Sequence, residues 1–362
     1  MAVYDMKPTK SAPVNSKGAW HWVRENLFSS PLNILLTFLG VGLLYLIIPP
    51  FLQWAYFDAT FIGSTREDCA VNGGACWVFI NYKLDMFMYG FYPEGERWRL
   101  NLGLGLFVLL LLALRYLKST LMKFAFFNLF LVAAAILTIG GTLGLEMVPT
   151  DRWGGLMLTI VVAATGIIVA FPIGVFLALG RASDLPIIRS ICVTYIEFIR
   201  GVPLITILFM SSIILPLFFP EGITFDKLLR ALIGIAMFEA AYIAENIRGG
   251  LQAIPKGQYE AADAIGLSYW QKMGLVILPQ ALKVAIPNLV GVSIALFQDT
   301  TLVLIIGLFD LLGMVRLSAA DSYWLGFETE GYVFVTFIFW FFCYSMSRFS
   351  QRLEKRFNTN LQ

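Results

Sequence analysis

The stretch WGGLMLTIVVAATGIIVAFPIGVFLALG at residues 153–180 contains no charged side chain. Crossing about 30 Å of hydrocarbon takes roughly 20 apolar residues in a helix, because lipid offers no partner for an unpaired backbone amide. This stretch is long enough, so it predicts a membrane-spanning helix. Of the 362 residues in the chain, 58% are hydrophobic and 14% are charged, whereas a soluble domain carries roughly 25% charge. We expect an all-α integral membrane protein and exclude a soluble enzyme, a disordered chain and a nucleic-acid-binding module.

Seven other stretches have a similar character, and together with 153–180 they predict eight spans. Four of them lack charged residues, namely Pro31–Phe57, 124–145, 201–220 and 331–347. Three are weaker. The stretch 100–114 is short, although Arg99 and Arg115 on its flanks could reach the two interfaces. The other two contain a carboxylate each, Glu239 in 231–244 and Asp299 in 284–309.

The basic residues indicate how these spans are oriented. With the N-terminus inside, most of the 26 lysines and arginines fall in cytoplasmic segments, as the positive-inside rule requires. An odd number of spans would place the basic tail outside, so we expect both termini in the cytoplasm. The first apolar run is too long for a cleavable signal peptide. Without organelle signals, we expect a bacterial inner membrane.

The composition divides the chain into parts. We expect a cytoplasmic arm at 1–30, a three-span extension at 31–150 with an external loop at 58–99, a five-helix core at 153–347 and a cytoplasmic tail at 348–362. In the core the loops shorten and polar residues recur between spans. No internal repeat is evident, which weakens a secondary-transporter interpretation, because such repeats are common in that class.

The cysteines and the histidine bear on redox chemistry and metals. Cys69 and Cys76 lie in the external loop, on the oxidising side of the membrane, and we expect a small local disulfide between them. Two free cysteines are the alternative, since closing so short a loop stabilises only modestly. With one histidine and four scattered cysteines, we expect no metal site.

The longest cytoplasmic segment, 245–283, reads ENIRGGLQAIPKGQYEAADAIGLSYWQKMGLVILPQALK. It is far longer than a helix connection needs, and its composition favours helix. Gly266 offers a break between two helices, and Ser268 can cap a second helix that starts at Tyr269. The second helix carries an apolar stripe that needs a surface to bury against, formed by Trp270, Met273, Val276 and Ile277. Such a helix–turn–helix is suited to transmitting force to another subunit.

This segment resembles a known family. Glu260-Ala261-Ala262 and Gly266, followed by Val276-x-Leu278-Pro279, resemble the EAA loop of ABC-importer permeases. Further motifs are similar to signatures of the polar-amino-acid subfamily: YIEFIRGVPL at 195–204, AENIRGG at 244–250 and DTTL at 299–302. The resemblance covers about 153–350, and the three-span extension is similar to the larger permeases of general L-amino-acid (Aap/Bzt-type) systems. Gln298 stands where lysine is common in the subfamily.

The resemblance implies a permease subunit of a type I ABC importer that moves L-amino acids into the cytoplasm by alternating access. It implies that Glu260, Ala261, Ala262 and Gly266 belong to a coupling helix docked in a groove of a cytoplasmic ATPase. The implied partners are a homologous permease subunit in a heterodimer, two ABC ATPase subunits and a periplasmic amino-acid-binding protein. This chain has no Gly-Lys dipeptide and therefore no phosphate-binding loop. We expect no catalytic residue and no cofactor in it, and ATP and magnesium on the ATPase.

The alternative for this loop is a helix that merely lies on the membrane surface. Such a helix would have a basic polar face, whereas Glu260 and Asp263 make 258–266 acidic.

Carboxylates within spans suggest a transport pathway, because each costs on the order of 2.5–3.5 kcal/mol on insertion scales and usually faces a cavity or a partner. We expect Glu239 and Asp299 to face the translocation cavity and to meet the α-ammonium of an amino acid. Gln298, Thr300 and Thr301 form a polar belt beside Asp299. The alternative is that each carboxylate only makes hydrogen bonds between helices.

Four charged residues are expected at the cytoplasmic boundary. Glu245 and Arg248 are predicted to form a gating or structural ion pair. Arg200 pairs with Glu197 or with acids of the EAA loop, unless it is an ordinary positive-inside anchor.

The alternative function is an ion-coupled secondary amino-acid transporter in which Glu239 and Asp299 carry protons. A membrane-embedded scaffold or enzyme is a third class, and no nucleophile–base or metal constellation in the sequence supports it.

Overall fold

The computed structural model describes residues 18–69, 73–220 and 225–358. Within these ranges every regular element is a helix. The α-helices are α1 (Ala19–Leu27), α2 (Pro31–Leu52), α3 (Trp77–Tyr89), α4 (Arg97–Tyr116), α5 (Thr120–Ile139), α6 (Gly155–Arg181), α7 (Pro186–Gly201), α8 (Leu204–Phe209), α9 (Lys227–Gln252), α10 (Lys256–Ala264), α11 (Tyr269–Gln271), α12 (Leu278–Asp299), α13 (Leu311–Ala319) and α14 (Glu328–Asn358). The chain divides into two compact units, Met1–Val78 and Phe79–Gln362.

The membrane-crossing character of the helices agrees with the predicted fold class. Among the described residues, six stretches are long and apolar enough to cross a membrane: Pro31–Phe57, Glu94–Tyr116, Thr120–Ile139, Gly155–Arg181, Tyr269–Ile306 and Glu328–Lys355. A seventh results if the bent pair Pro186–Gly201 and Leu204–Phe218 counts as one span. The remaining predicted span corresponds to α9, which is less apolar because it carries Glu239, Glu245 and Arg248.

The segment 245–283, predicted to be a cytoplasmic loop, is more continuous with the spans than the sequence predicts. The helix expected to start at Tyr269 is joined to the following span in one helical stretch, Tyr269–Ile306. Pro279 does not end it. The proline ring excludes the normal α-helical bond four residues back, and the chain widens there into a π turn, Lys272–Ile277. The predicted tail is likewise a continuation of α14 as far as Asn358.

The span predicted at 201–220 corresponds to the helical segment Leu204–Phe218, which follows α7 after a bend of 104°. Within this segment α8 leads into a π turn, Met210–Ile214. Pro216 has no N–H, so the carbonyl of Ser212 lacks its usual helical partner. The guanidinium of Arg230 on α9 donates to that carbonyl instead.

In the first unit, α2 is apolar on all sides and has no buried side chain. Ser30 caps it by accepting a hydrogen bond from the backbone N–H of Asn33. The segment after α2 is held by a disulfide between Cys69 and Cys76, whose Cα atoms are 5.4 Å apart. The two predicted disulfide residues are therefore joined.

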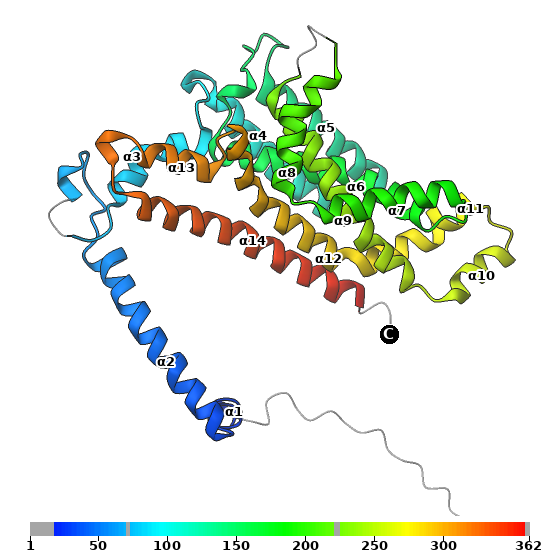
Figure 1. Cartoon of the computed structure of the whole chain (residues 1–362), viewed down its shortest axis with the longest axis horizontal. Helices are drawn as coiled ribbons and strands as arrows, with labels where there is room; N and C mark the ends of the chain where they lie inside the picture. The colour runs from blue at the N-terminus through cyan, green and yellow to red at the C-terminus, as the bar shows by residue number, and fades with distance from the viewer. Residues whose placement is uncertain (1–17, 70–72, 221–224, 359–362) are drawn as a thin grey trace, which may run out of the picture. The chain divides into compact units, whose positions relative to one another are not determined.

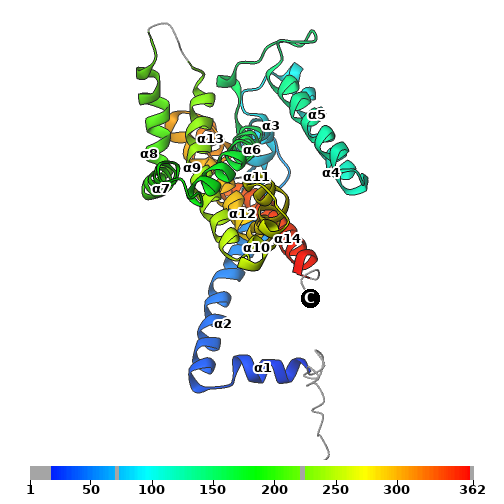
Figure 2. The ribbon, with the colours of Figure 1, turned by 90° about the vertical axis from the view of Figure 1, so that its right-hand side faces the viewer.

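The second unit is built on α6 and α9, which pack along their length with α7 and α12 beside α9 (Figure 1, Figure 2). Small residues allow the close approach. A Cβ on Gly166 would lie 2.9 Å from Ile235, and one on Gly174 would lie 2.5 Å from Ile243. Close packing of small residues is how helices associate in lipid, where the hydrophobic effect gives little drive.

The two ends of the second unit carry different elements. Figure 1 shows α3 and α13 at one end and α10 and α11 at the other. The sequence predicts the first pair to be external and the second to be cytoplasmic. The segment 58–99, predicted to be an external loop, is partly helical because it contains α3. From α3, Phe79 packs against Trp324 and Phe87 against Phe334, with ring centroids 5.5 and 5.7 Å apart.

Arg99 differs from its predicted place at an interface. It is fully buried, its Nε lies 2.8 Å from Glu96 Oε2, and its Nη1 donates to the carbonyl of Glu146 at 2.9 Å. This contact joins the start of α4 to the segment after α5.

Candidate functional site

The predicted coupling helix is α10, and its end is sharply defined. Gly266 has a φ of +74°, a left-handed conformation that disfavours any residue with a Cβ. The N–H of Gly266 donates to the carbonyl of Asp263, and that of Leu267 donates to the carbonyl of Ala262. These are the two hydrogen bonds of a Schellman motif. Gln271 then accepts from the backbone N–H of Ser268 at 3.0 Å and caps the next helix.

The four predicted coupling residues are divided between surface and core. Glu260, Ala261 and Gly266 are exposed, whereas Ala262 is only 2% exposed. α10 is tied to the helix that follows, because Lys272 Nζ lies 2.7 Å from Asp263 Oδ1. The exposed side of α10 therefore carries Glu260 and Ala261.

The apolar stripe of the second helix is also divided. Met273 and Ile277 are buried in the core, so they anchor this helix within the chain. Trp270 is 68% exposed, and Ile265 and Leu275 are exposed as well. These three exposed apolar residues, at the end of α10 and in the helix after it, are called here the α10 patch.

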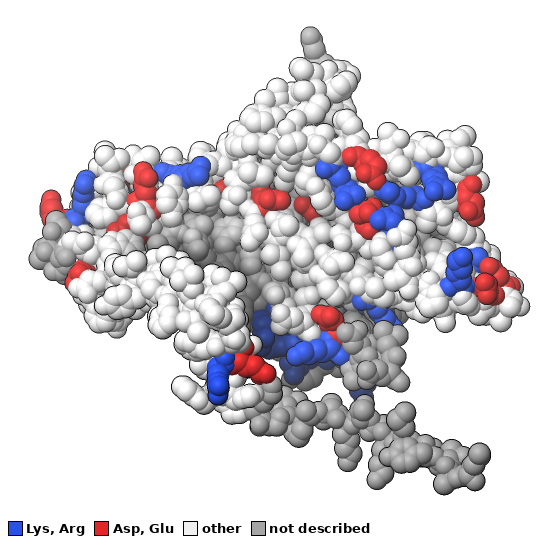
Figure 3. Space-filling view, turned by 60° about the horizontal axis from the view of Figure 1, so that its bottom comes forward, with Lys and Arg blue, Asp and Glu red and all other residues white. Residues whose placement is uncertain are grey.

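The four predicted boundary charges lie in one ion-pair network, together with Arg181. Arg181 Nη1, at the end of α6, lies 2.8 Å from Glu197 Oε1 and 3.5 Å from Glu245 Oε2. Arg200 Nη1 of α7 lies 3.7 Å from Glu245 Oε2, and Arg248 binds Glu245 through two nitrogens. Three helices thus meet at Glu245. On the face shown in Figure 3, charged side chains gather in a few such groups separated by uncharged surface.

The electrostatics of this network are set by the arginines. The hydrogen bond from Arg248 holds the pKa of Glu245 below its ordinary value, with the nearby charges of Arg200 and Arg181 acting in the same direction and burial opposing them. Glu245 is therefore ionised at neutral pH. The sequence indicated the pair with Arg248 but missed Arg181, whose only signal was its place at the end of an uncharged helix.

Glu239 and Asp299 come from different helices and lie near each other. Glu239 on α9 is 3% exposed, and Asp299 is the last residue of α12 and half-buried. Their carboxylates are close enough to interact electrostatically. Within the described part of the chain, neither side chain forms a hydrogen bond or an ion pair. Two unpaired carboxylates at this depth provide a place for a cationic group.

The polar belt around Asp299 is not one continuous surface. Gln298 and Thr301 line a cavity of about 470 Å³ with residues of α13 and α14, among them Thr336 and Cys343. Thr300 is buried, and its hydroxyl donates to the carbonyl of Phe297. Gln298 and Thr301 therefore line an open cavity. The hydroxyl of Thr300 only makes a hydrogen bond to a nearby backbone carbonyl.

Comparison with known proteins supports the same interpretation. The family described as "Binding-protein-dependent transport system inner membrane component" matches residues 170–359. The chain is 54% identical, over 97% of its own length and 96% of the relative, to the inner membrane amino-acid ABC transporter permease protein YhdY of Escherichia coli K12. It is 39% identical, over 97% of its length and 96% of the relative, to the glutamate/glutamine/aspartate/asparagine transport system permease protein BztC of Rhodobacter capsulatus.

A crystal structure of an amino acid ABC transporter with histidines matches with a TM-score of 0.49 and 29% identity, covering 56% of this chain and 92% of that one. The two full-length matches to permeases favour the importer interpretation over an ion-coupled carrier. The same matches make the chain a multi-pass membrane protein rather than an enzyme. The chain belongs to the family of binding-protein-dependent transport system inner membrane components.

Proposed function

We propose that this chain is the permease subunit of an ATP-driven importer that carries L-amino acids into the cytoplasm. The substrate class is taken from the names of the two full-length relatives, which are both amino-acid transport permeases. The single observation that carries the mechanism is the exposed α10, ended by Gly266 and flanked by the uncovered α10 patch.

In this proposal α10 is held in a groove of a cytoplasmic ATPase subunit. Glu260 offers a charge to a basic partner, Ala261 lets the backbones approach closely, and the apolar α10 patch is covered by the ATPase. An exposed apolar patch next to a charged rim is typical of a protein-binding surface. The ATP and magnesium belong to the ATPase, because this chain has no phosphate-binding loop.

Motion of α10 would pass to the transport pathway through the helix that follows it. The ion pair Lys272–Asp263 and the hydrogen bond from Gln280 Nε2 to Gln258 Oε1, at 3.1 Å, join α10 to the stretch Tyr269–Ile306. Asp299 lies on that same stretch. A tilt of α10 driven by ATPase closure would therefore move Asp299 relative to Glu239 on α9.

Glu239 and Asp299 are proposed to meet the substrate's α-ammonium, with Gln298 and Thr301 at the edge of the pathway and the buried Thr300 behind them. The ion-pair network of Glu197, Arg200, Glu245 and Arg248 is proposed to close the cytoplasmic side. We infer two ATPase subunits, a homologous permease in a heterodimer, and a periplasmic amino-acid-binding protein as partners. The location is a bacterial inner membrane, with both termini in the cytoplasm.

Crosslinking in the assembled transporter tests the coupling step. Ala261→Cys, on the exposed side of α10 and labelled with a benzophenone maleimide, is expected to crosslink to the ATPase on irradiation, because the benzophenone inserts into nearby C–H bonds. Glu94→Cys, an exposed position in the predicted external segment, is the matched control and should not. Crosslinking of neither variant to the ATPase contradicts the docking of α10.

Uptake in proteoliposomes tests the energy source. Import is expected to require ATP on the ATPase side and to continue with a protonophore present. Uptake that survives without ATP but collapses with the protonophore would show an ion-coupled carrier instead.

A further inference from the structure

A second cavity lies near the ion-pair network, at the start of the segment 245–283. It measures about 630 Å³ and opens where α6 ends, α7 begins and α9 leads into α10. Its described wall includes three arginines, Arg181, Arg189 and Arg248, and one carboxylate, Asp184. Arg181 and Arg248 also belong to the ion-pair network described above, which contains Arg200, Glu197 and Glu245. Counted with that network, four arginines stand against three carboxylates, so one positive charge remains uncompensated.

The three arginines retain free donors. Among the described residues, the side chain of Arg189 forms no hydrogen bond or ion pair. Arg181 contacts its carboxylates through Nη1 alone, and Arg248 uses Nε and Nη2, which leaves Nη1. A guanidinium has five N–H donors in a planar fork that matches phosphate oxygens. Three such forks around one cavity fit a group that has several anionic oxygens.

The depth of the cavity indicates where that group comes from. α6 has 27 residues and no charge before Arg181, so at 1.5 Å per residue it is about 40 Å long, enough to reach from one interface to the other. Arg181 is then at the level of lipid headgroups. A soluble anion would be favoured only if the cavity were surrounded by polar surface.

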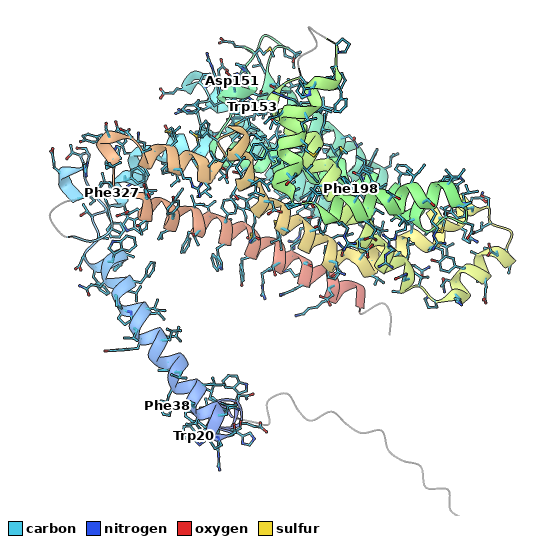
Figure 4. The ribbon with its side chains drawn as sticks, viewed as in Figure 1. Trp20, Phe38, Asp151, Trp153, Phe198 and Phe327 are labelled. Carbon is cyan, nitrogen blue, oxygen red and sulfur yellow. A yellow bond between two sulfur atoms is a disulfide. The ribbon has the colours of Figure 1, made fainter. Side chains whose placement is uncertain are left out.

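One side of α7 is apolar and exposed. It carries Ile187, Ile191 and Phe198, the last 67% exposed and labelled in Figure 4. Arg189, two residues after Ile187, lies about 200° around the helix from it, on the side that lines the cavity. A helix with one apolar side and a cationic residue on the opposite side is typical of a helix that lies in the membrane interface, at the level of the lipid phosphates.

We propose that this cavity binds the phosphate group of an anionic phospholipid, with Arg189 as its main contact and Arg181 and Arg248 as further donors. The proposal does not depend on the substrate or on the ATPase.

The test measures protection of Arg189 from phenylglyoxal in the complete transporter purified in detergent, read by peptide mass spectrometry. Short-chain phosphatidylglycerol is expected to protect Arg189, whereas short-chain phosphatidylcholine and inorganic phosphate at the same concentration are not. Equal protection by phosphatidylcholine would show a non-specific surface effect, and equal protection by phosphate would show a site for free anions. Either result overturns the proposal.

Native mass spectrometry provides a second measurement. Arg189→Gln is expected to weaken retention of phosphatidylglycerol about five-fold, the effect of one basic residue at a membrane surface. Because Arg189 has no side-chain partner among the described residues, the substitution should leave folding unchanged. Arg115→Gln, at the exposed end of α4, is the matched control and should retain lipid normally. Equal retention in Arg189→Gln and the wild type contradicts the proposal.

Discussion

Glu245 Oε1 lies 2.5 Å from Arg248 Nη2, and Glu245 Oε2 accepts a second hydrogen bond from Arg248 Nε at 2.9 Å. The same carboxylate lies within 4 Å of Arg181 on α6 and of Arg200 on α7. One acidic side chain therefore serves three guanidiniums from three helices. Any motion that separates α6, α7 and α9 at this end must break contacts with Glu245.

Replacing Glu245 with glutamine should destabilise the transporter. Glu197 would then be the acid left in the network for three arginines, and coupling within such networks is about 0.5–3 kcal/mol. We expect a lower thermal midpoint for Glu245→Gln in detergent at pH 7.5. Glu354→Gln, an exposed carboxylate on α14, should match the wild type.

The same variant has a defined pH dependence. The pKa of Glu245 is lowered in the fold, so its contribution is present above its unfolded pKa of about 4.3 and is lost as pH falls through the folded value. The difference between wild type and Glu245→Gln should therefore shrink as the pH is lowered below about 4. A difference that grows in acid would contradict this assignment.

Replacing Gly266 with alanine should impair coupling. The left-handed conformation at φ +74° costs a residue with a Cβ roughly 1–2 kcal/mol, although a Cβ there would meet no other atom within 4 Å. We expect slower ATP-dependent uptake, with the complex still assembled. Gly257→Ala is the control, because this glycine lies inside α10, where alanine favours helix. If both variants transport equally, the turn at Gly266 has no role in coupling.

The local parts of this structure follow from local sequence. The uncharged stretch 153–180 corresponds to α6, and Gly266 with Ser268 marks the break between α10 and the next helix, because glycine and capping preferences act within a few residues. The merger of the second helix with the span after it was not predictable in this way. It depends on the π turn Lys272–Ile277, which comes just before Pro279 and lets the helix continue through the proline.

Long-range contacts were the part that sequence could not supply. Arg99 and Arg181 both follow the pattern of interfacial arginines at the ends of apolar stretches. One is buried against Glu96 and the other joins Glu197 and Glu245. The partner of an arginine depends on how helices far apart in sequence pack together. The spacing of charges along one helix does not determine that packing. The burial of Met273 beside an exposed Trp270 depends on packing for the same reason.

Replacing the carboxyl groups of Glu239 and Asp299 with amides should reduce transport. With both Glu239→Gln and Asp299→Asn, we expect uptake of the amino acid to fall at least ten-fold, roughly the loss of one charge-assisted hydrogen bond of about 1.5–3 kcal/mol. The measurement is the initial rate in proteoliposomes, with ATPase activity recorded in parallel. Glu328→Gln, exposed at the start of α14, should transport normally. Normal rates and selectivity in the double variant would exclude a role for these carboxylates in the pathway.

Asp310 should make the external end of the second unit sensitive to pH. It is completely buried and caps α13 by accepting from the N–H groups of Leu312 and Gly313. Burial raises its pKa to about 6, although those hydrogen bonds and Arg316 oppose the shift. A raised folded pKa stabilises the fold below the unfolded value of about 3.9, and this stability is lost as pH rises through about 6.

Asp310→Asn should therefore flatten the dependence of the thermal midpoint on pH between 4 and 7. Asp321→Asn is the contrasting variant, because a hydrogen bond from Lys83 lowers the pKa of Asp321 and its effect should shrink in acid. If Asp310→Asn leaves the pH profile between 4 and 7 unchanged, Asp310 is not the group that titrates there.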